Sequence, residues 1–249
     1  YTSGSTRFPR GVEISQRTVM TNLRDIAVHG LKITQQDRMV SWLPLYHDMG
    51  LVGFMLLPLG SQLSADYLSP RTFAMRPRLW LKVISQNRGT ISSSPPFGYA
   101  LCAKRLRLTD HDRYDLSSWR VACVGAERIH PEPLRQFAHV LKPAKFNATA
   151  FVACYGMAEC ALAISFAELD VGIAAVKVDK ELMATTGQVV IRSDDPQAPT
   201  DTLTFVDCGK ILPSFALNIR DDNGKDLPDY QCGRICLKGA SVMSGYFQN

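Results

Sequence analysis

The sequence has no long apolar run and no cluster of positive charge. Its longest apolar stretch, Leu51 to Leu59, is about half of the ~20 residues that a membrane helix needs. No run of Lys and Arg exceeds two residues, and 28 basic residues against 23 acidic ones leave a net charge of +5. We therefore expect neither stable membrane insertion nor nucleic-acid binding, and a polyanionic small ligand is enough to explain the basic excess.

Cysteine is present, but not in a pattern typical of a metal site or a disulfide framework. The seven cysteines are an odd number, and most of them lie in apolar stretches. Cys232 and Cys236 have no second cysteine pair and no neighbouring histidine to complete a zinc site. We expect reduced, buried thiols in a cytoplasmic protein.

The sequence also lacks an initiating methionine and any visible secretion or transit signal. It begins at Tyr1, inside what reads as a loop. We therefore expect this chain to be a fragment at its N-terminal end.

The opening segment YTSGSTRFPRG is the first candidate binding element. Small and hydroxyl residues follow one another from Thr2 to Thr6, so backbone N–H groups and O–H donors can converge on one point without crowding by Cβ atoms. Such a concavity suits a polyphosphate. It is not a Walker A loop, because no Lys follows a second glycine at the required spacing. The alternative is a Ser/Gly-rich surface linker.

The rest of the sequence divides into two patterns. With 249 residues and 46% hydrophobic content, the chain can bury a large core. Strand-like and helix-like stretches alternate over residues 1–165, which predicts an α/β fold with a parallel sheet. Short strands and turns over residues 166–249 predict a smaller β-rich part, with a hairpin at the DDNG segment, 221–224, between Leu217–Arg220 and Arg234–Lys238.

Two helices matter for the expected site. Ser15 is a candidate N-cap for a helix from Gln16 to His29, which would direct its positive end towards the opening segment. A second helix is expected to begin at the YGMAE segment, 155–159. This segment follows an expected strand, as does the GAE segment, 125–127, and ligands in parallel sheets lie at the carboxyl ends of strands.

A third polar segment precedes an apolar helix. Tyr46, His47 and Asp48 lead directly into the stretch from Leu51 to Leu59. Polar groups beside an apolar wall suit a ligand with a carboxylate head and an apolar tail. The alternative is a histidine that is merely hydrogen bonded by its neighbouring aspartate.

These segments, in this order, resemble the acyl-adenylate-forming superfamily of acyl-CoA synthetases, adenylation domains and luciferases. The resemblance rests on YTSGSTRFPRG, YGMAE and GRICLKGASVMSGYF (233–247), and it extends over essentially the whole chain. The segments PLYHDMGLVG, SSPPFGYALC and GAERI look most like the fatty acyl-AMP ligases. The resemblance implies activation of a fatty acid by ATP, release of pyrophosphate, and transfer of the acyl group to an acyl carrier protein. The alternatives are an acyl-CoA synthetase and a non-catalytic nucleotide- or acyl-binding relative.

The resemblance also implies roles for individual residues. Glu159 would bind Mg²⁺, and His47 would lie beside the acyl carboxylate and the α-phosphate, so that both are candidate catalytic residues. Tyr155 would stack on adenine. The remaining ATP-binding candidates are Thr2, Ser3, Gly4, Ser5, Thr6, Gly125, Ala126, Glu127, Gly156, Met157 and Ala158. The acyl-binding candidates are His47, Asp48, Met49, Phe97 and Tyr99.

Some features depart from the family pattern. Arg7 stands where the family usually has Gly, Arg10 where it has Lys, and Ala158 where Thr is common, although Ala is typical of fatty acyl-AMP ligases at this position. The ribose-binding aspartate and the C-terminal domain with its catalytic lysine would follow Asn249. The stretch 166–205 resembles in position the insertion that distinguishes fatty acyl-AMP ligases. We expect it to pack on the large domain through Leu169, Val171, Ile173, Ala174, Ala175 and Val176, the alternative being an ordinary β-element.

Overall fold

The computed structural model describes residues 1–2, 8–106, 113–192 and 201–248. Within these residues the largest sheet has seven strands in the order β11-β7-β6-β5-β4-β2-β3. Strands β3, β2, β4, β5 and β6 run parallel, whereas β7 and β11 pair antiparallel. The strands are β2 (Arg38–Ser41), β3 (Ser64–Tyr67), β4 (Ile91–Ser94), β5 (Val121–Val124), β6 (Phe151–Gly156), β7 (Ala163–Phe166) and β11 (Lys210–Ile211). The expected α/β fold is confirmed, with a mixed sheet instead of a wholly parallel one.

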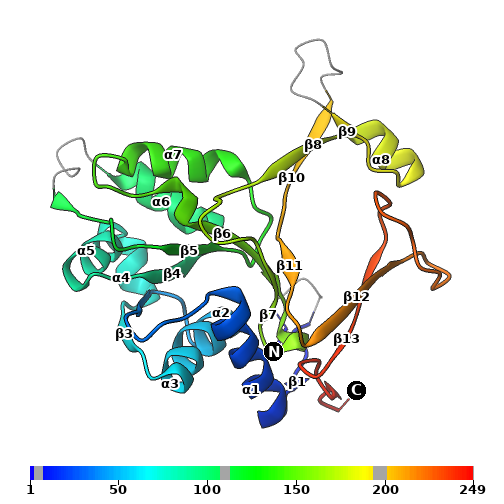
Figure 1. Ribbon diagram of the computed structural model, residues 1–249, viewed down its shortest axis with the longest axis horizontal. Coiled ribbons are helices and arrows are strands. Elements are labelled where there is room, and N and C mark those ends of the chain that lie inside the picture. Colours follow the sequence, from blue (N-terminus) through cyan, green and yellow to red (C-terminus); the bar gives the residue numbers. More distant parts are fainter. Residues whose placement is uncertain (3–7, 107–112, 193–200, 249) are drawn as a thin grey trace.

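Helices cover both faces of this sheet. Figure 1 shows α6 (Pro96–Arg105) and α7 (Pro131–Leu141) above the strands, and α1 (Gln16–Asp25) and α3 (Leu57–Ser61) below them. Strands β4 and β5 are consequently buried along their whole length. Two further helices, α4 (Pro70–Met75) and α5 (Arg78–Asn87), connect β3 to β4.

Aromatic side chains fill much of the core. The rings of Trp80 and Trp119 are 5.1 Å apart between centroids, and the rings of Tyr99 and Phe137 are also 5.1 Å apart. All four side chains are buried. Edge-to-face aromatic pairs of this kind contribute about 0.5–1.5 kcal/mol beyond burial of their area. The packed rings form a rigid base for the loops at the carboxyl ends of β4 and β5.

The helix expected after Ser15 is present, but it changes its winding before it ends. The Ser15 hydroxyl accepts a hydrogen bond from the N–H of Thr18, which confirms the predicted cap. The α-helical part ends at Asp25, and a wider π-helical turn, η1 (Ile26–Gly30), follows. The expected apolar helix likewise consists of α2 (Asp48–Gly50), a π-helical segment η2 (Leu51–Leu56) and α3. Such π segments are frequent at functional sites.

The prediction of a helix beginning at the YGMAE segment is wrong. The chain forms only a short 3-10 turn, η5 (Ala158–Cys160), and Ala161 then adopts a φ of 65°. This reversal sends the chain back as β7, antiparallel to β6. A Cβ at Gly156 would collide with the carbonyl oxygen of Leu162, so the close approach of the two strands requires glycine there.

Asn22 joins the first helix to strand β7. Its side-chain amide donates to the carbonyl of Ala163 (2.8 Å) and its amide oxygen accepts from the N–H of the same residue (3.0 Å). Asn22 is fully buried. It therefore takes the place of a neighbouring strand at this position and fixes α1 against the sheet.

The second part of the chain forms smaller antiparallel sheets. One contains β8 (Ala175–Asp179), β9 (Ile191–Arg192) and β10 (Thr202–Val206), and α8 (Lys180–Thr186) follows β8. The expected hairpin exists as β12 (Phe215–Arg220) paired with β13 (Arg234–Gly239). The DDNG segment closes only a small loop with a bridge between Arg220 and Asp226, and the chain makes a further excursion before β13 begins. Strand β7 runs across residue 165, and β11 rejoins the large sheet further along the chain. The expected division of the chain at residue 165 therefore stays a prediction.

The candidate insertion is anchored by fewer residues than expected. Leu169 and Ile173 pack against the core. The other four apolar residues of the expected face are exposed: Val171, Ala174, Ala175 and Val176. Figure 1 shows β8, β10 and α8 extending away from the large sheet, and the end of α8 reaches the loop before β13, where the N–H of Val189 donates to the carbonyl of Tyr230 (2.8 Å).

Among the described residues, the helices are too short or too polar for one of them to span a bilayer.

Candidate active site

A cavity of about 310 Å³ brings together residues from four of the segments identified in the sequence. Its polar lining includes Thr2, His47, Asp48 and Glu159. Its apolar lining comes mainly from the two π-helical segments and the strands beside them: Ile26, Leu31, Met39, Gly53, Phe54, Leu57, Leu162 and Phe166. A cavity with one polar region and a long apolar wall matches a ligand with a charged head and an apolar tail. We call it the main cavity.

His47 stands at the entrance of the apolar helix. Its Nδ1 lies 2.7 Å from Oδ1 of Asp48, and the same oxygen accepts the N–H of Met49 (2.7 Å). The hydrogen bond to Asp48 raises the pKa of His47 above its usual value, despite the opposing effect of burial. The histidine is thus held by its neighbouring aspartate and also lines the cavity, so both readings of this segment describe the structure. Because Nδ1 is engaged, Nε2 is the ring nitrogen left for a ligand.

Glu159 lies in the 3-10 turn after β6. Its Oε1 accepts a hydrogen bond from the hydroxyl of Tyr246 (2.8 Å), and its carbonyl accepts the N–H of Met243 (2.7 Å). The carboxylate is half-buried and faces the main cavity. The sequence did not single out Tyr246 as a site residue, although its GYF segment was noted, because the hydrogen bond joins positions 87 residues apart.

The described ends of the opening segment are tied together. The N–H of Thr2 donates to the carbonyl of Arg10 (2.9 Å), and the N–H of Arg10 donates to the hydroxyl of Thr2 (3.0 Å). Thr2 is buried and lines the main cavity. The candidates Ser3, Gly4, Ser5 and Thr6 lie outside the described residues.

A second cavity, also of about 310 Å³, adjoins the GAE segment. Ala126, Glu127, Tyr155 and Gly156 line it on one side. The opposite side is formed by β10 and the residues after it, namely Thr204, Phe205, Val206 and Cys208. Four of the ATP-binding candidates therefore surround one space, which we call the GAE cavity.

Ala126 occupies a junction between cavities. It lines the main cavity, the GAE cavity and a third cavity of about 400 Å³. Its φ of 67° is a left-handed conformation that a non-glycine residue adopts at a cost of about 1–2 kcal/mol. The preceding residue has to be glycine, since a Cβ at Gly125 would lie 2.8 Å from the carbonyl oxygen of Cys154.

Glu127 does more than border a cavity. Its carboxylate accepts the N–H of Phe97 (3.0 Å) at the first turn of α6. A negative charge at a helix N-terminus is favourable because the exposed N–H groups there carry partial positive charge. Glu127 thus connects the GAE segment to the helix that carries two of the acyl-binding candidates.

Those two candidates are separated by the structure. Phe97 is half-exposed and lines the third cavity together with Trp42 and Phe73, and we call this the aromatic cavity. Tyr99 is fully buried in the aromatic core, and its hydroxyl donates to the carbonyl of Cys123 (2.8 Å). The expectation that Tyr99 lines the tail pocket is therefore wrong. His47, Asp48 and Met49 line the main cavity, and their expected role in acyl binding stays a prediction.

The residues of the main cavity fit a magnesium ion that arrives with a nucleotide. No group of three or more metal-ligating side chains occurs among the described residues. Mg²⁺ is typically held by one or two carboxylates together with substrate phosphates, and Glu159 supplies one carboxylate. The other ATP-binding candidates in this region, Met157 and Ala158, line the main cavity beside it.

Comparison with known proteins agrees with this geometry. A family model described as AMP-binding enzyme matches residues 1–247. A protein of Caulobacter vibrioides, provisionally named an acyl-CoA synthetase, is 44% identical over 100% of this chain and 43% of its own length. The medium-chain-fatty-acid–[acyl-carrier-protein] ligase TtuA of Teredinibacter turnerae is 34% identical over 100% of this chain and 38% of its own.

Solved structures of adenylate-forming enzymes are also similar to this chain. A structure from a study of fatty acyl-adenylate ligases from E. coli and L. pneumophila is 50% identical to this chain, with a TM-score of 0.94. The match covers 100% of this chain and 45% of that one. The chain therefore spans less than half of the length of each of these three proteins.

Proposed function

The chain belongs to the AMP-binding enzymes of the acyl-adenylate-forming superfamily, and on this basis we propose that it activates a fatty acid with ATP to give a fatty acyl-adenylate and pyrophosphate. The observation that carries the proposal is the main cavity, where Thr2, His47 and Glu159 lie at the polar region of one long apolar pocket. A fatty acid has a charged head and an apolar tail, and this cavity has a place for each.

The chemistry explains why these side chains are needed. A carboxylate oxygen of the fatty acid attacks the α-phosphorus of ATP while the bond to the oxygen of the leaving pyrophosphate breaks. Both partners are anions, so positioning and neutralisation of charge supply most of the catalysis. Thr2 and the segment that follows it would hold the β- and γ-phosphates. The Mg²⁺ ion that accompanies ATP supplies positive charge, and Glu159 would hold it.

The other residues have positioning roles in this proposal. The GAE cavity, with Tyr155 and Ala126 in its walls, would take the adenine ring. His47, kept in place by Asp48, would present Nε2 to the acyl carboxylate. The apolar wall of η2 and α3, with Phe54 and Leu57, would exclude water from the tail and the reacting carboxylate.

The acceptor of the acyl group follows from the relatives. The ligase TtuA is named for an acyl-carrier-protein acceptor, and we propose the same class of partner for this protein. The second candidate is a synthetase that completes a coenzyme A thioester, as the name of the Caulobacter protein indicates. The third is a relative that binds nucleotide or acyl group without catalysis.

One experiment separates the three. The full-length protein is incubated with ATP, Mg²⁺ and a series of fatty acids, alone and with coenzyme A or a phosphopantetheinylated carrier protein. The proposal is supported if pyrophosphate is released, acyl-adenylate is formed, and the carrier protein becomes loaded with the acyl group. Accumulation of acyl-CoA favours the second candidate. Binding of ATP without pyrophosphate release at any chain length favours the third.

A further inference from the structure

A series of contacts joins the base of the opening segment to the carboxylate of Glu159, and Tyr246 lies at its centre. We propose that Tyr246 is a positioning residue for Glu159: its hydroxyl fixes Oε1, so that Oε2 is kept for the metal that accompanies ATP. The inference rests on the proposed function, because it concerns how Glu159 meets the metal–ATP complex.

Residues 243–246 hold Glu159 at two points. The Tyr246 hydroxyl donates to Oε1 (2.8 Å), and the N–H of Met243 donates to the carbonyl of the same glutamate (2.7 Å). Tyr246 and Glu159 are both half-buried. The backbone of Glu159 is thus fixed by Met243 and its carboxylate by Tyr246, so the side chain has less rotational freedom to lose when a ligand binds.

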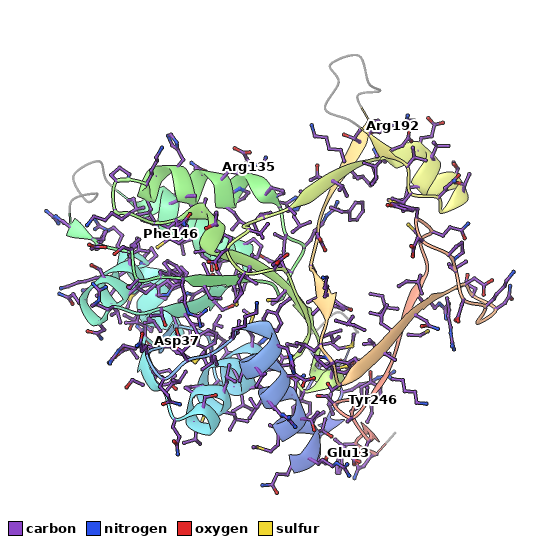
Figure 2. All side chains as sticks on the ribbon, viewed as in Figure 1. Glu13, Asp37, Arg135, Phe146, Arg192 and Tyr246 are labelled. Carbon is purple, nitrogen blue, oxygen red and sulfur yellow. The ribbon has the colours of Figure 1, made fainter. Side chains whose placement is uncertain are left out.

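Tyr246 is itself fixed by a short sheet. It lies in β14 (Gly245–Tyr246), which pairs antiparallel with β1 (Val12–Glu13) and places Tyr246 opposite Val12. The N–H of Phe247 donates to the carbonyl of Gly11 (2.8 Å). Figure 2 shows Tyr246 and Glu13 at the same end of the molecule. Strand β1 follows directly after the opening segment, so Tyr246 is attached to the chain that leaves this segment.

Arg10 completes the connection. Its guanidinium lies over the ring of Tyr246, 5.1 Å from the centroid. Its main chain makes both hydrogen bonds to Thr2 that close the opening segment. A cation over a phenol ring is attracted to the ring face, so Arg10 helps to hold the ring whose hydroxyl donates to Glu159. The phosphate end of the cavity and its carboxylate are therefore linked through two neighbouring side chains.

Hydrogen-bond partners of a metal ligand commonly set its affinity. Loss of such a partner typically lowers metal affinity about 10–100-fold, because the ligand no longer has a fixed orientation. For this protein the effect should appear only when a metal is bound, since Tyr246 acts through Glu159. This distinguishes positioning from a general structural role.

The test is the Tyr246→Phe variant of the full-length protein, with ATP binding measured by calorimetry. Binding is measured once with Mn²⁺ as the metal and once with a chelator and no metal. We expect Tyr246→Phe to weaken binding of Mn·ATP about tenfold and to leave binding of metal-free ATP unchanged. The matched control is Tyr67→Phe, which removes a phenol that donates to the carbonyl of Phe54 (2.7 Å). It should change neither measurement.

A second variant keeps the inference falsifiable. In a Glu159→Gln background, Tyr246→Phe should add no further loss of Mn·ATP binding. An equal loss with and without metal, or an equal loss in the Glu159→Gln background, would overturn the positioning role. Failure of the proposed function looks different: the unmodified protein would bind no ATP, or would release no pyrophosphate with any fatty acid.

Discussion

The guanidinium of Arg128 lies over the ring of Phe205, 5.4 Å from its centroid. Arg128 follows the GAE segment, and Phe205 belongs to β10 in the candidate insertion. Both residues line the GAE cavity. The contact therefore attaches the candidate insertion to the place where we propose that the nucleotide binds.

The first prediction concerns this attachment. The N–H of Asp207 donates to the carbonyl of Ala174 (3.0 Å), so the ends left by removal of residues 175–206 lie close enough to be joined by two glycines. We expect the shortened full-length protein to retain adenylation with weaker ATP binding, because Ala126 and Tyr155 remain in the GAE cavity while its β10 wall is lost. It should also form some acyl-CoA, since the family resemblance implies that such an insertion restricts a C-terminal domain. Products are measured by mass spectrometry.

The matched control is Val171→Ala, a change at an exposed residue of the same stretch. It should leave the product unchanged. A shortened protein that folds and adenylates but makes no acyl-CoA would show that the insertion does not exclude coenzyme A.

Glu159→Gln is the second prediction. The variant keeps the size of the side chain but removes its negative charge, so the metal–phosphate complex loses a charged ligand. We expect pyrophosphate release to fall about 100-fold or more. Glu132→Gln, at an exposed position of α7, is the control and should behave as the unmodified protein. Near-normal pyrophosphate release by Glu159→Gln would contradict the proposed role.

The third prediction concerns His47. Removal of a hydrogen bond to a charged group costs about 1.5–3 kcal/mol, so His47→Ala should lower kcat/KM for the fatty acid about tenfold or more. The affinity for ATP should be preserved. His139→Ala, in an exposed position of α7, serves as the control. An equal fall in ATP affinity would mean that His47 supports the fold and not the acid.

Gly53 gives the fourth prediction, on acyl chain length. It lines the main cavity, and an added Cβ would lie 3.1 Å from Cδ2 of Leu162, which lines the cavity too. Gly53→Ala should therefore narrow the pocket and shift the preference to shorter acids, by about fourfold per methylene that no longer fits, equivalent to ~0.8 kcal/mol.

Gly60→Ala is the matched control in the same helical segment. Its Cβ would meet Leu23 at 3.8 Å, an ordinary contact outside the main cavity. Pyrophosphate release across a series of acids measures the preference of both variants. An unchanged chain-length profile in Gly53→Ala would mean that the acyl tail does not bind in this cavity.

The fifth prediction concerns stability in acid. Burial opposes ionisation of Asp37, but hydrogen bonds from Arg120, Thr34 and Thr90 outweigh it and lower the pKa from 3.8 to about 2. Because the folded pKa lies below the unfolded one, the stabilisation is complete above about pH 4 and is lost as the pH falls towards 2. Its size is about 2 kcal/mol.

Denaturant unfolding at several pH values tests this. Asp37→Asn should destabilise the protein at pH 6, and the difference from the unmodified protein should shrink below pH 4. Asp226→Asn, which removes the exposed partner of Arg220, should have little effect because surface ion pairs contribute little. A difference that stays constant from pH 6 to pH 2 would contradict the assigned pKa.

Local sequence signals predicted the elements well, but not which face of an element meets a ligand. Phe97 and Tyr99 are two apart in one helix, so they point to nearly opposite sides: Phe97 lines the aromatic cavity, whereas Tyr99 is buried in the core. The prediction of a helix at YGMAE failed for a related reason: the positive φ at Ala161 carries no local sequence signal, because alanine rarely adopts it.

The remaining features depend on contacts between distant segments. Tyr246 is 87 residues from Glu159, and Phe205 lies far along the chain from Arg128. The spacing of residues along one sequence does not predict which distant residues come into contact. The GAE and YGMAE segments were predicted to lie at the carboxyl ends of strands, and residues of both line the main cavity. This could be predicted because parallel strands place their carboxyl ends at the same edge of a sheet.

The buried amide of Asn22 has a consequence for how the cavity is made. Its two hydrogen bonds to Ala163 span 141 residues, and they join the α1 side of the cavity to the β7 side. Contacts of this separation form slowly, because a long loop has to close before they stabilise anything. During synthesis, a ribosome-bound chain that has not yet released residue 163 lacks the β7 wall of the main cavity, which includes Ala163 and Phe166. The walls of the main cavity can therefore be joined only after the polypeptide has emerged beyond this point, which places closure of the cavity among the long-range steps of folding.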